Sequence, residues 1–128
     1  MADLDAVADA QRAVRDRPWP LWLYPANTLL LGVMALTPLL GVVRLGAWVV
    51  LGLAVFGLNY WAGHRIGTPF AVPTSRGFRV ALTATALFLA TAMITGTAGS
   101  SWLVVASAVG TMISYGVGSV FHHRSTRR

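Results

Sequence analysis

VALTATALFLATAMITGTAGSSWLVVASAVGTMISYGVGSVFHH, residues 80–123, contains no Lys, Arg, Asp or Glu over 44 consecutive positions. One crossing of the hydrocarbon core of a bilayer needs roughly 20 apolar residues, so this stretch is long enough for two crossings. Two further charge-free runs precede it, at 18–43 and 45–64. These runs predict an all-α integral membrane protein, a membrane-spanning four-helix bundle with little chain outside the bilayer.

The composition supports this class. The chain has 128 residues, of which 55% are hydrophobic and 11% are charged, whereas a typical soluble domain carries about 25% charged residues. It contains no Cys, which excludes disulfides and thiolate chemistry. The formal net charge is +6, but the Arg residues flank apolar segments, which favours anionic lipid headgroups and not nucleic acid as their partners.

The predicted domain organisation has three parts. Residues 1–18 form an N-terminal cytoplasmic or interfacial segment, 19–123 form the four-helix bundle, and 124–128 form a basic cytoplasmic tail. The helices are expected at about 21–43, 45–63, 78–95 and 102–121. Within the first segment, Leu4, Val7 and Val14 recur near helical spacing, which predicts a short amphipathic helix lying on the inner leaflet.

The breaks between helices follow from small residues and proline. The first turn is expected around Gly41 to Gly46, with Pro38 bending the helix before it because proline lacks an N–H donor. The small, polar stretch 96–101 separates the third and fourth helices.

The distribution of arginine predicts the orientation. With four spans, nine of the ten Arg residues fall on one side of the membrane, and Arg44 alone falls on the other. The positive-inside rule makes the arginine-rich side cytoplasmic. Both termini are therefore expected in the cytoplasm, and the protein in the inner cell membrane.

Four polar residues fall at one predicted depth in the bilayer. Counted inward at 1.5 Å per residue, they lie roughly 8–10 Å from the inner interface. This layer is either a polar cavity open to the cytoplasm or a set of hydrogen bonds between helices. Its members are Asn27, Asn59, Thr83 and Ser114.

A stripe of small residues recurs every four positions on the fourth predicted helix. Such spacing allows another helix to approach closely, either from the same chain or from a second copy. The stripe consists of Ala106, Gly110, Ser114 and Gly118.

The start of the third predicted helix is a candidate anion site. Thr74 or Ser75 can cap this helix, and Arg76 and Arg79 follow in its first turn. Free N–H groups beside guanidinium groups favour an anion, and a phospholipid headgroup is the simplest one. The alternative is an ordinary helix cap whose arginines serve topology alone.

The histidines do not indicate a metal site. His64, His122 and His123 all belong to the predicted cytoplasmic face, but no carboxylate supports them outside the N-terminal segment. The adjacent His122 and His123 also point to different sides of a helix. Interfacial anchoring is the expected role, and neither a metal nor another cofactor is predicted.

Two known groups share the size but not the key residues. The small multidrug-resistance transporters use a membrane-embedded glutamate, and no acid follows Asp16 here. The dimeric fluoride channels have a glycine-rich first helix without a clear counterpart. Through NYWAGHR at 59–65 and GTPFAVPTSRGF at 67–78, the chain resembles small four-span membrane proteins of high-GC actinobacteria, a group without an established activity. The resemblance implies a membrane setting and no mechanism.

The sequence favours a non-enzymatic polytopic membrane protein. We expect an assembly or partner subunit that binds anionic lipid headgroups at its cytoplasmic face and packs as a homo-oligomer or against another membrane subunit. The alternative is a small transporter, flippase or channel that uses the polar layer. A lipid-modifying enzyme using His64 and arginine residues is a third hypothesis, which the absence of acids and Cys in the spans disfavours.

Overall fold

The computed structural model describes residues 2–15, 18–67 and 75–127, and within these residues every regular element is a helix. The predicted all-helical class is therefore confirmed. The elements are α1 (Ala2–Arg15), α2 (Leu23–Leu36), the 3-10 helix η1 (Thr37–Val43), α3 (Arg44–Arg65), α4 (Arg76–Thr97) and α5 (Ser101–Thr126).

Three helical stretches are long and apolar enough to cross a membrane. They are Leu23–Arg65, Arg76–Thr97 and Ser101–Thr126, with mean hydropathies of 2.2, 1.7 and 1.6. Large apolar side chains are exposed along them, which suits a lipid environment and not water. Examples from three different helices are Leu29, Phe56 and Ile113.

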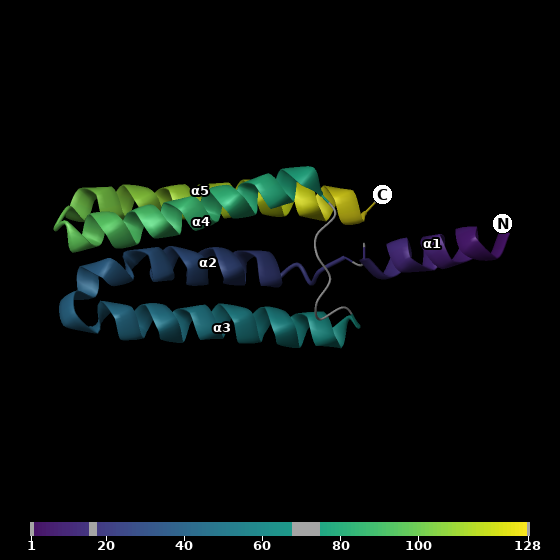
Figure 1. The fold of residues 1–128 in the computed structure, drawn as a ribbon, viewed down its shortest axis with the longest axis horizontal. Helices are drawn as coiled ribbons and strands as arrows, with labels where there is room; N and C mark the ends of the chain where they lie inside the picture. Colours follow the sequence, from purple (N-terminus) through teal and green to yellow (C-terminus); the bar gives the residue numbers. More distant parts are fainter. Residues whose placement is uncertain (1, 16–17, 68–74, 128) are drawn as a thin grey trace.

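The first stretch folds back on itself at its middle. Gly41 has φ 65° and ψ −125°, a conformation outside the helical region that side-chain-bearing residues rarely adopt, and it reverses the chain between α2 and α3. Figure 1 shows these two helices running side by side. The α-helix predicted at 21–43 instead ends at Leu36, because Pro38 lies in the first turn of the tighter 3-10 segment that begins at Thr37. The predicted turn to Gly46 is also too long, since α3 already begins at Arg44.

The turn between α4 and α5 is equally tight. Gly99 adopts φ 80° and donates its N–H to the Gly96 carbonyl, while Ser100 donates to Thr95 at 2.9 Å. This pair of bonds is the Schellman motif that closes many helices. The break is therefore shorter than the predicted 96–101. At its other end α5 continues past the predicted position 121 to Thr126, because no Gly or Pro follows Gly118 to stop it.

Helix α2 lies between α3 on one side and the α4–α5 pair on the other (Figure 1). No Cα atom of α3 lies within 8 Å of α4 or α5 among the described residues, so α3 is held by α2 and η1. The ends of α3 and α5 and the beginnings of α2 and α4 lie at one end of the bundle (Figure 1). The chain reversals lie at the other.

The core changes character along the bundle. Toward the chain reversals, Ala35, Ala92 and Ala108 meet, and such small side chains let α2, α4 and α5 approach closely. Toward the other end the core consists of larger side chains, including Phe78 and Tyr115.

No Cα atom of α1 lies within 8 Å of a Cα atom of another helix in the described residues, and α1 extends from the end of the bundle (Figure 1). Leu4 and Val7 are exposed, as an interfacial helix requires before it meets a membrane. The side chain of Val14 lies outside the described residues. The proposed anchoring role of α1 remains a prediction.

Candidate functional site

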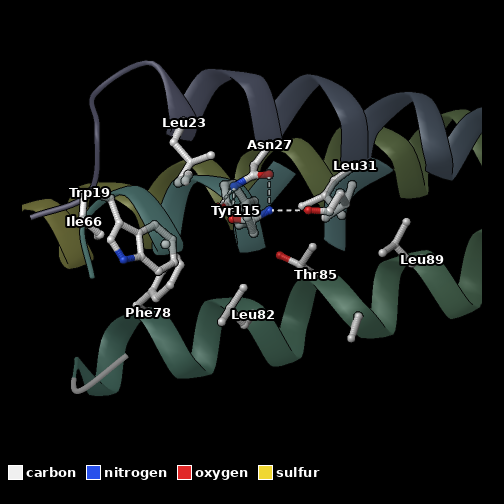
Figure 2. A pocket seen from close by; sticks show the side chains of 15 residues that line it. Trp19, Leu23, Asn27, Leu31, Ile66, Phe78, Leu82, Thr85, Leu89 and Tyr115 are labelled. Atoms are coloured by element: carbon white, nitrogen blue, oxygen red, sulfur yellow. Dashed lines mark hydrogen bonds between the residues drawn. The ribbon is translucent and has the colours of Figure 1, made fainter. Parts of the chain in front are cut away.

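A cleft of about 410 Å³ is lined by residues of α2, α3, α4 and α5 together with Trp19. Helix α3 contributes one wall and α4 another, and no Cα atoms of these two helices approach within 8 Å in the described residues, which leaves space between them. Figure 2 shows Trp19 and Phe78 together at one end, with Leu89 toward the other. Most of the lining is apolar: Trp19, Leu23, Leu31, Val55, Ala62, Gly63, Ile66, Phe78, Leu82, Ala86 and Leu89.

One polar cluster lies inside this cleft. Asn27 of α2 donates through Nδ2 to Asn59 Oδ1 of α3 at 2.9 Å and to the Tyr115 hydroxyl of α5 at 2.9 Å. Asn59 returns a hydrogen bond to Asn27 Oδ1 at 2.7 Å and donates a second one to the Val55 carbonyl at 2.7 Å. The cluster links three helices, and both Asn27 and Tyr115 are buried.

The predicted polar layer is present in part. The structure joins Asn27 directly to Asn59, whereas Ser114 bonds instead to Thr85 at 2.9 Å. Thr83 does not belong to the layer, because its side chain is exposed and donates to the carbonyl of Arg79 in its own helix. Counting residues from the interface predicts the depth of a residue in the bilayer but not the helix face on which it lies. Thr83 and Thr85 differ by two positions, which corresponds to roughly 200° of rotation around α4.

Sequence reasoning missed Thr85 and Tyr115. Thr85 is buried, lines the cleft, and points into it in Figure 2. Tyr115 adjoins the predicted Ser114 but faces α2, whereas Ser114 faces α4. The available signal was a second hydroxyl close to each predicted position, Tyr115 next to Ser114 and Thr85 two residues after Thr83, and helix orientation was needed to choose between them.

Three members of the small-residue stripe face α4. A Cβ atom added at Gly110 would lie 2.6 Å from the Phe88 ring, and one at Gly118 would collide with Ala81. Ser114 forms a hydrogen bond with Thr85, which also belongs to α4. Ala106 departs from the stripe, since its side chain is exposed: four residues turn a helix by roughly 400°, about 40° more than one full turn, so the stripe drifts around α5.

The candidate anion site lies outside the cleft. Ser75 caps α4 by accepting a hydrogen bond from the Phe78 N–H at 3.3 Å. Arg76 and Arg79 are exposed and line no part of the cleft. Thr74 lies outside the described residues. The cap is therefore formed, and the two guanidinium groups are accessible at the start of α4.

The histidines occupy three different surroundings. His122 is buried, contrary to the expected interfacial position, and its Nδ1 lies 2.6 Å from the Tyr24 hydroxyl. The Trp19 ring covers it with centroids 4.2 Å apart. His64 is exposed, and His123 is half-buried. The extension of α5 beyond residue 121 explains the burial of His122, because it keeps that side chain on the helix face that meets α2.

The fold and the site together define a helical, membrane-compatible protein with an internal, mostly apolar cleft. Comparison of the chain with protein-family models, curated proteins and solved structures finds no match. The cleft is therefore the feature from which a function is inferred.

Proposed function

We propose that this protein is a non-enzymatic four-span membrane protein that binds an amphipathic, lipid-like molecule in the cleft between α3 and α4. The observation that carries the proposal is a cleft with mostly apolar walls that contains the hydrogen-bonded cluster Asn27–Asn59–Tyr115. Ligand sites in proteins share this character, and their volumes are roughly 300–1,000 Å³. The 410 Å³ of the cleft fall within that range.

A four-span topology is the second part of the proposal. The reversal at Gly41 supports it, because it divides the stretch Leu23–Arg65 into two antiparallel arms. Three stretches then give four crossings, with both chain ends on one side. The arginine distribution supports a cytoplasmic location for that side, in the inner cell membrane.

Anionic lipid headgroups are the proposed partners of the cytoplasmic end. The exposed Arg76 and Arg79 support this, since each lies in the first turn of α4, where the helix dipole also favours an anion. In this arrangement the protein contacts lipid twice, through headgroups at α4 and through the cleft. A role as an assembly or partner subunit follows, in a homo-oligomer or with another membrane subunit.

A small transporter or flippase is the alternative. It is favoured by the attachment of α3, whose backbone approaches α2 and η1 closely but comes within 8 Å of neither α4 nor α5, Cα to Cα, in the described residues. Movement of α3 away from α2 would widen the cleft and expose the polar cluster. A binding protein, by contrast, retains its ligand without such a movement.

Filling the cleft tests the proposal. Leu82 lines the cleft, whereas Leu87 on the same helix is 64% exposed and lies outside it. Purified Leu82→Trp is expected to lose a lipid-like molecule that wild-type protein and Leu87→Trp retain, as measured by mass spectrometry of extracted, co-purified lipids. Ala86→Trp is a second cleft variant at an exposed lining position, for use if Leu82→Trp does not fold. Identical lipid profiles for all variants would rule out the cleft as a binding site.

A further inference from the structure

The orientation of the polar cluster follows from one backbone carbonyl. Asn59 lies 2.7 Å from the Val55 carbonyl, which only accepts hydrogen bonds, so the nearby atom of Asn59 is the donor Nδ2. The Oδ1 of Asn59 then faces Asn27, and this makes the facing atom of Asn27 its Nδ2. Neither amide can be flipped without placing two acceptors against each other.

This orientation makes the Tyr115 hydroxyl an acceptor. Asn27 uses one N–H on Asn59 and its other N–H on the oxygen of Tyr115, at 2.9 Å each. The hydroxyl hydrogen of Tyr115 consequently has no acceptor within the described part of the chain. Tyr115 is 4% exposed and lines the cleft, where Figure 2 shows it beside Asn27.

A buried hydroxyl hydrogen normally has a partner. Among the residues that the structure describes, the lining of the cleft contains no charged side chain and no arginine. A carboxylate or phosphate placed there would be an unpaired buried charge, which is far more costly than an unpaired dipole. The missing partner is therefore an oxygen acceptor without a charge.

We propose that the ligand of the cleft is an uncharged amphiphile whose ester, ketone or quinone carbonyl accepts a hydrogen bond from Tyr115. Its hydrocarbon part lies along the apolar lining, which includes Val55, Leu82 and Leu89. This inference rests on the proposed function and adds the chemical class of the ligand. It also separates the cleft from the headgroup contacts at Arg76 and Arg79, which suit anions.

Three probes with the same twelve-carbon skeleton test the chemical class of the ligand. Methyl laurate presents an uncharged carbonyl, laurate presents an anion, and dodecane presents no hydrogen-bond acceptor. We expect wild-type protein in detergent to bind methyl laurate more tightly than either of the others at neutral pH. Loss of one hydrogen bond corresponds to a factor of about 3 to 10, so Tyr115→Phe should weaken methyl laurate binding by that factor and leave dodecane binding unchanged.

Tyr60→Phe is the matched control, because Tyr60 is exposed on α3 and lies outside the cleft. It should preserve the preference for methyl laurate. If wild-type protein prefers laurate, or if Tyr115→Phe keeps the full preference for the ester, the proposal is wrong. The second result would assign the hydroxyl hydrogen to a bound water molecule.

An infrared measurement tests the same bond without a variant. The carbonyl band of ¹³C-labelled methyl laurate should shift to lower frequency in the wild-type cleft relative to the ester in hydrocarbon solvent. An unshifted band would overturn the proposal even if Tyr115→Phe does not fold. Loss of all binding in Leu82→Trp together with an unshifted band would support the cleft as a binding site while rejecting its carbonyl ligand. Equal binding of every probe to Leu82→Trp and wild type would reject both.

Discussion

Asn27 and Asn59 hydrogen-bond to each other in both directions, with N···O distances of 2.9 and 2.7 Å. The pair joins α2 to α3, the helix whose Cα atoms all lie more than 8 Å from those of α4 and α5 in the described residues. A reciprocal amide pair at this position both holds α3 in place and presents the polar surface of the cleft. Its strength therefore bears on stability and on binding.

A double-mutant cycle measures this pair. Asn27→Leu and Asn59→Leu should each reduce stability, and their coupling free energy should be about 0.6 kcal/mol, reaching about 1.7 kcal/mol at most, as for other hydrogen bonds between membrane helices. Unfolding in mixed detergent provides the measurement. Thr83→Val is the control, since Thr83 bonds within its own helix and should add independently to Asn59→Leu. Strictly additive effects of the two Asn substitutions would contradict the reciprocal pair.

Substitution of alanine for two different glycines on α5 should have opposite effects on the stability of the protein. Gly118→Ala places its Cβ against Ala81 and 3.2 Å from the Phe78 ring, so it should cost about 1–3 kcal/mol through overpacking. Gly116→Ala meets nothing within 4 Å and should leave stability unchanged or raise it by about 0.5–1 kcal/mol, because alanine favours the helix. Thermal unfolding in detergent compares the two. Equal melting temperatures for both variants would mean that α4 and α5 are not packed as described.

Single cysteines test the four-span topology. The chain contains no Cys, so each introduced thiol reports alone. Val42→Cys and Ala98→Cys, at the two chain reversals, should react with a membrane-impermeant thiol reagent in intact cells. His64→Cys and Ser125→Cys, at the opposite end, should react only after lysis. Reaction of Ser125→Cys but not Val42→Cys in intact cells would invert the predicted orientation.

The headgroup proposal predicts that two pairs of arginines contribute unequally to the retention of anionic phospholipid. Replacing Arg76 and Arg79 with Gln should lower the retention of anionic phospholipid measured by native mass spectrometry, because the pair flanks the start of α4. Replacing Arg124 and Arg127 with Gln removes the same charge near the C-terminal end of α5, where the helix dipole disfavours an anion. A smaller loss is expected from this control. Equal losses would indicate general charge attraction and no localised site.

Several features could be predicted from the sequence because they depend on local chemistry. The charge-free runs identified the helical, membrane-compatible segments, and Gly41 and Gly99 lie in or beside the predicted breaks. The depth count also brought Asn27 and Asn59 to one level, since the rise per residue of a helix is constant. These inferences need only the order of residues along the chain.

The tertiary structure decided which face of each helix meets which neighbour. It placed Thr85 and not Thr83 inside, turned Tyr115 toward Asn27, and buried His122 against Tyr24. In a membrane, apolar residues are acceptable on every face of a helix, so hydrophobic periodicity says little about orientation. The sequence alone determined that the chain is helical and suited to a bilayer, whereas the tertiary structure determined the cleft, because only the relative rotation and separation of the helices create it.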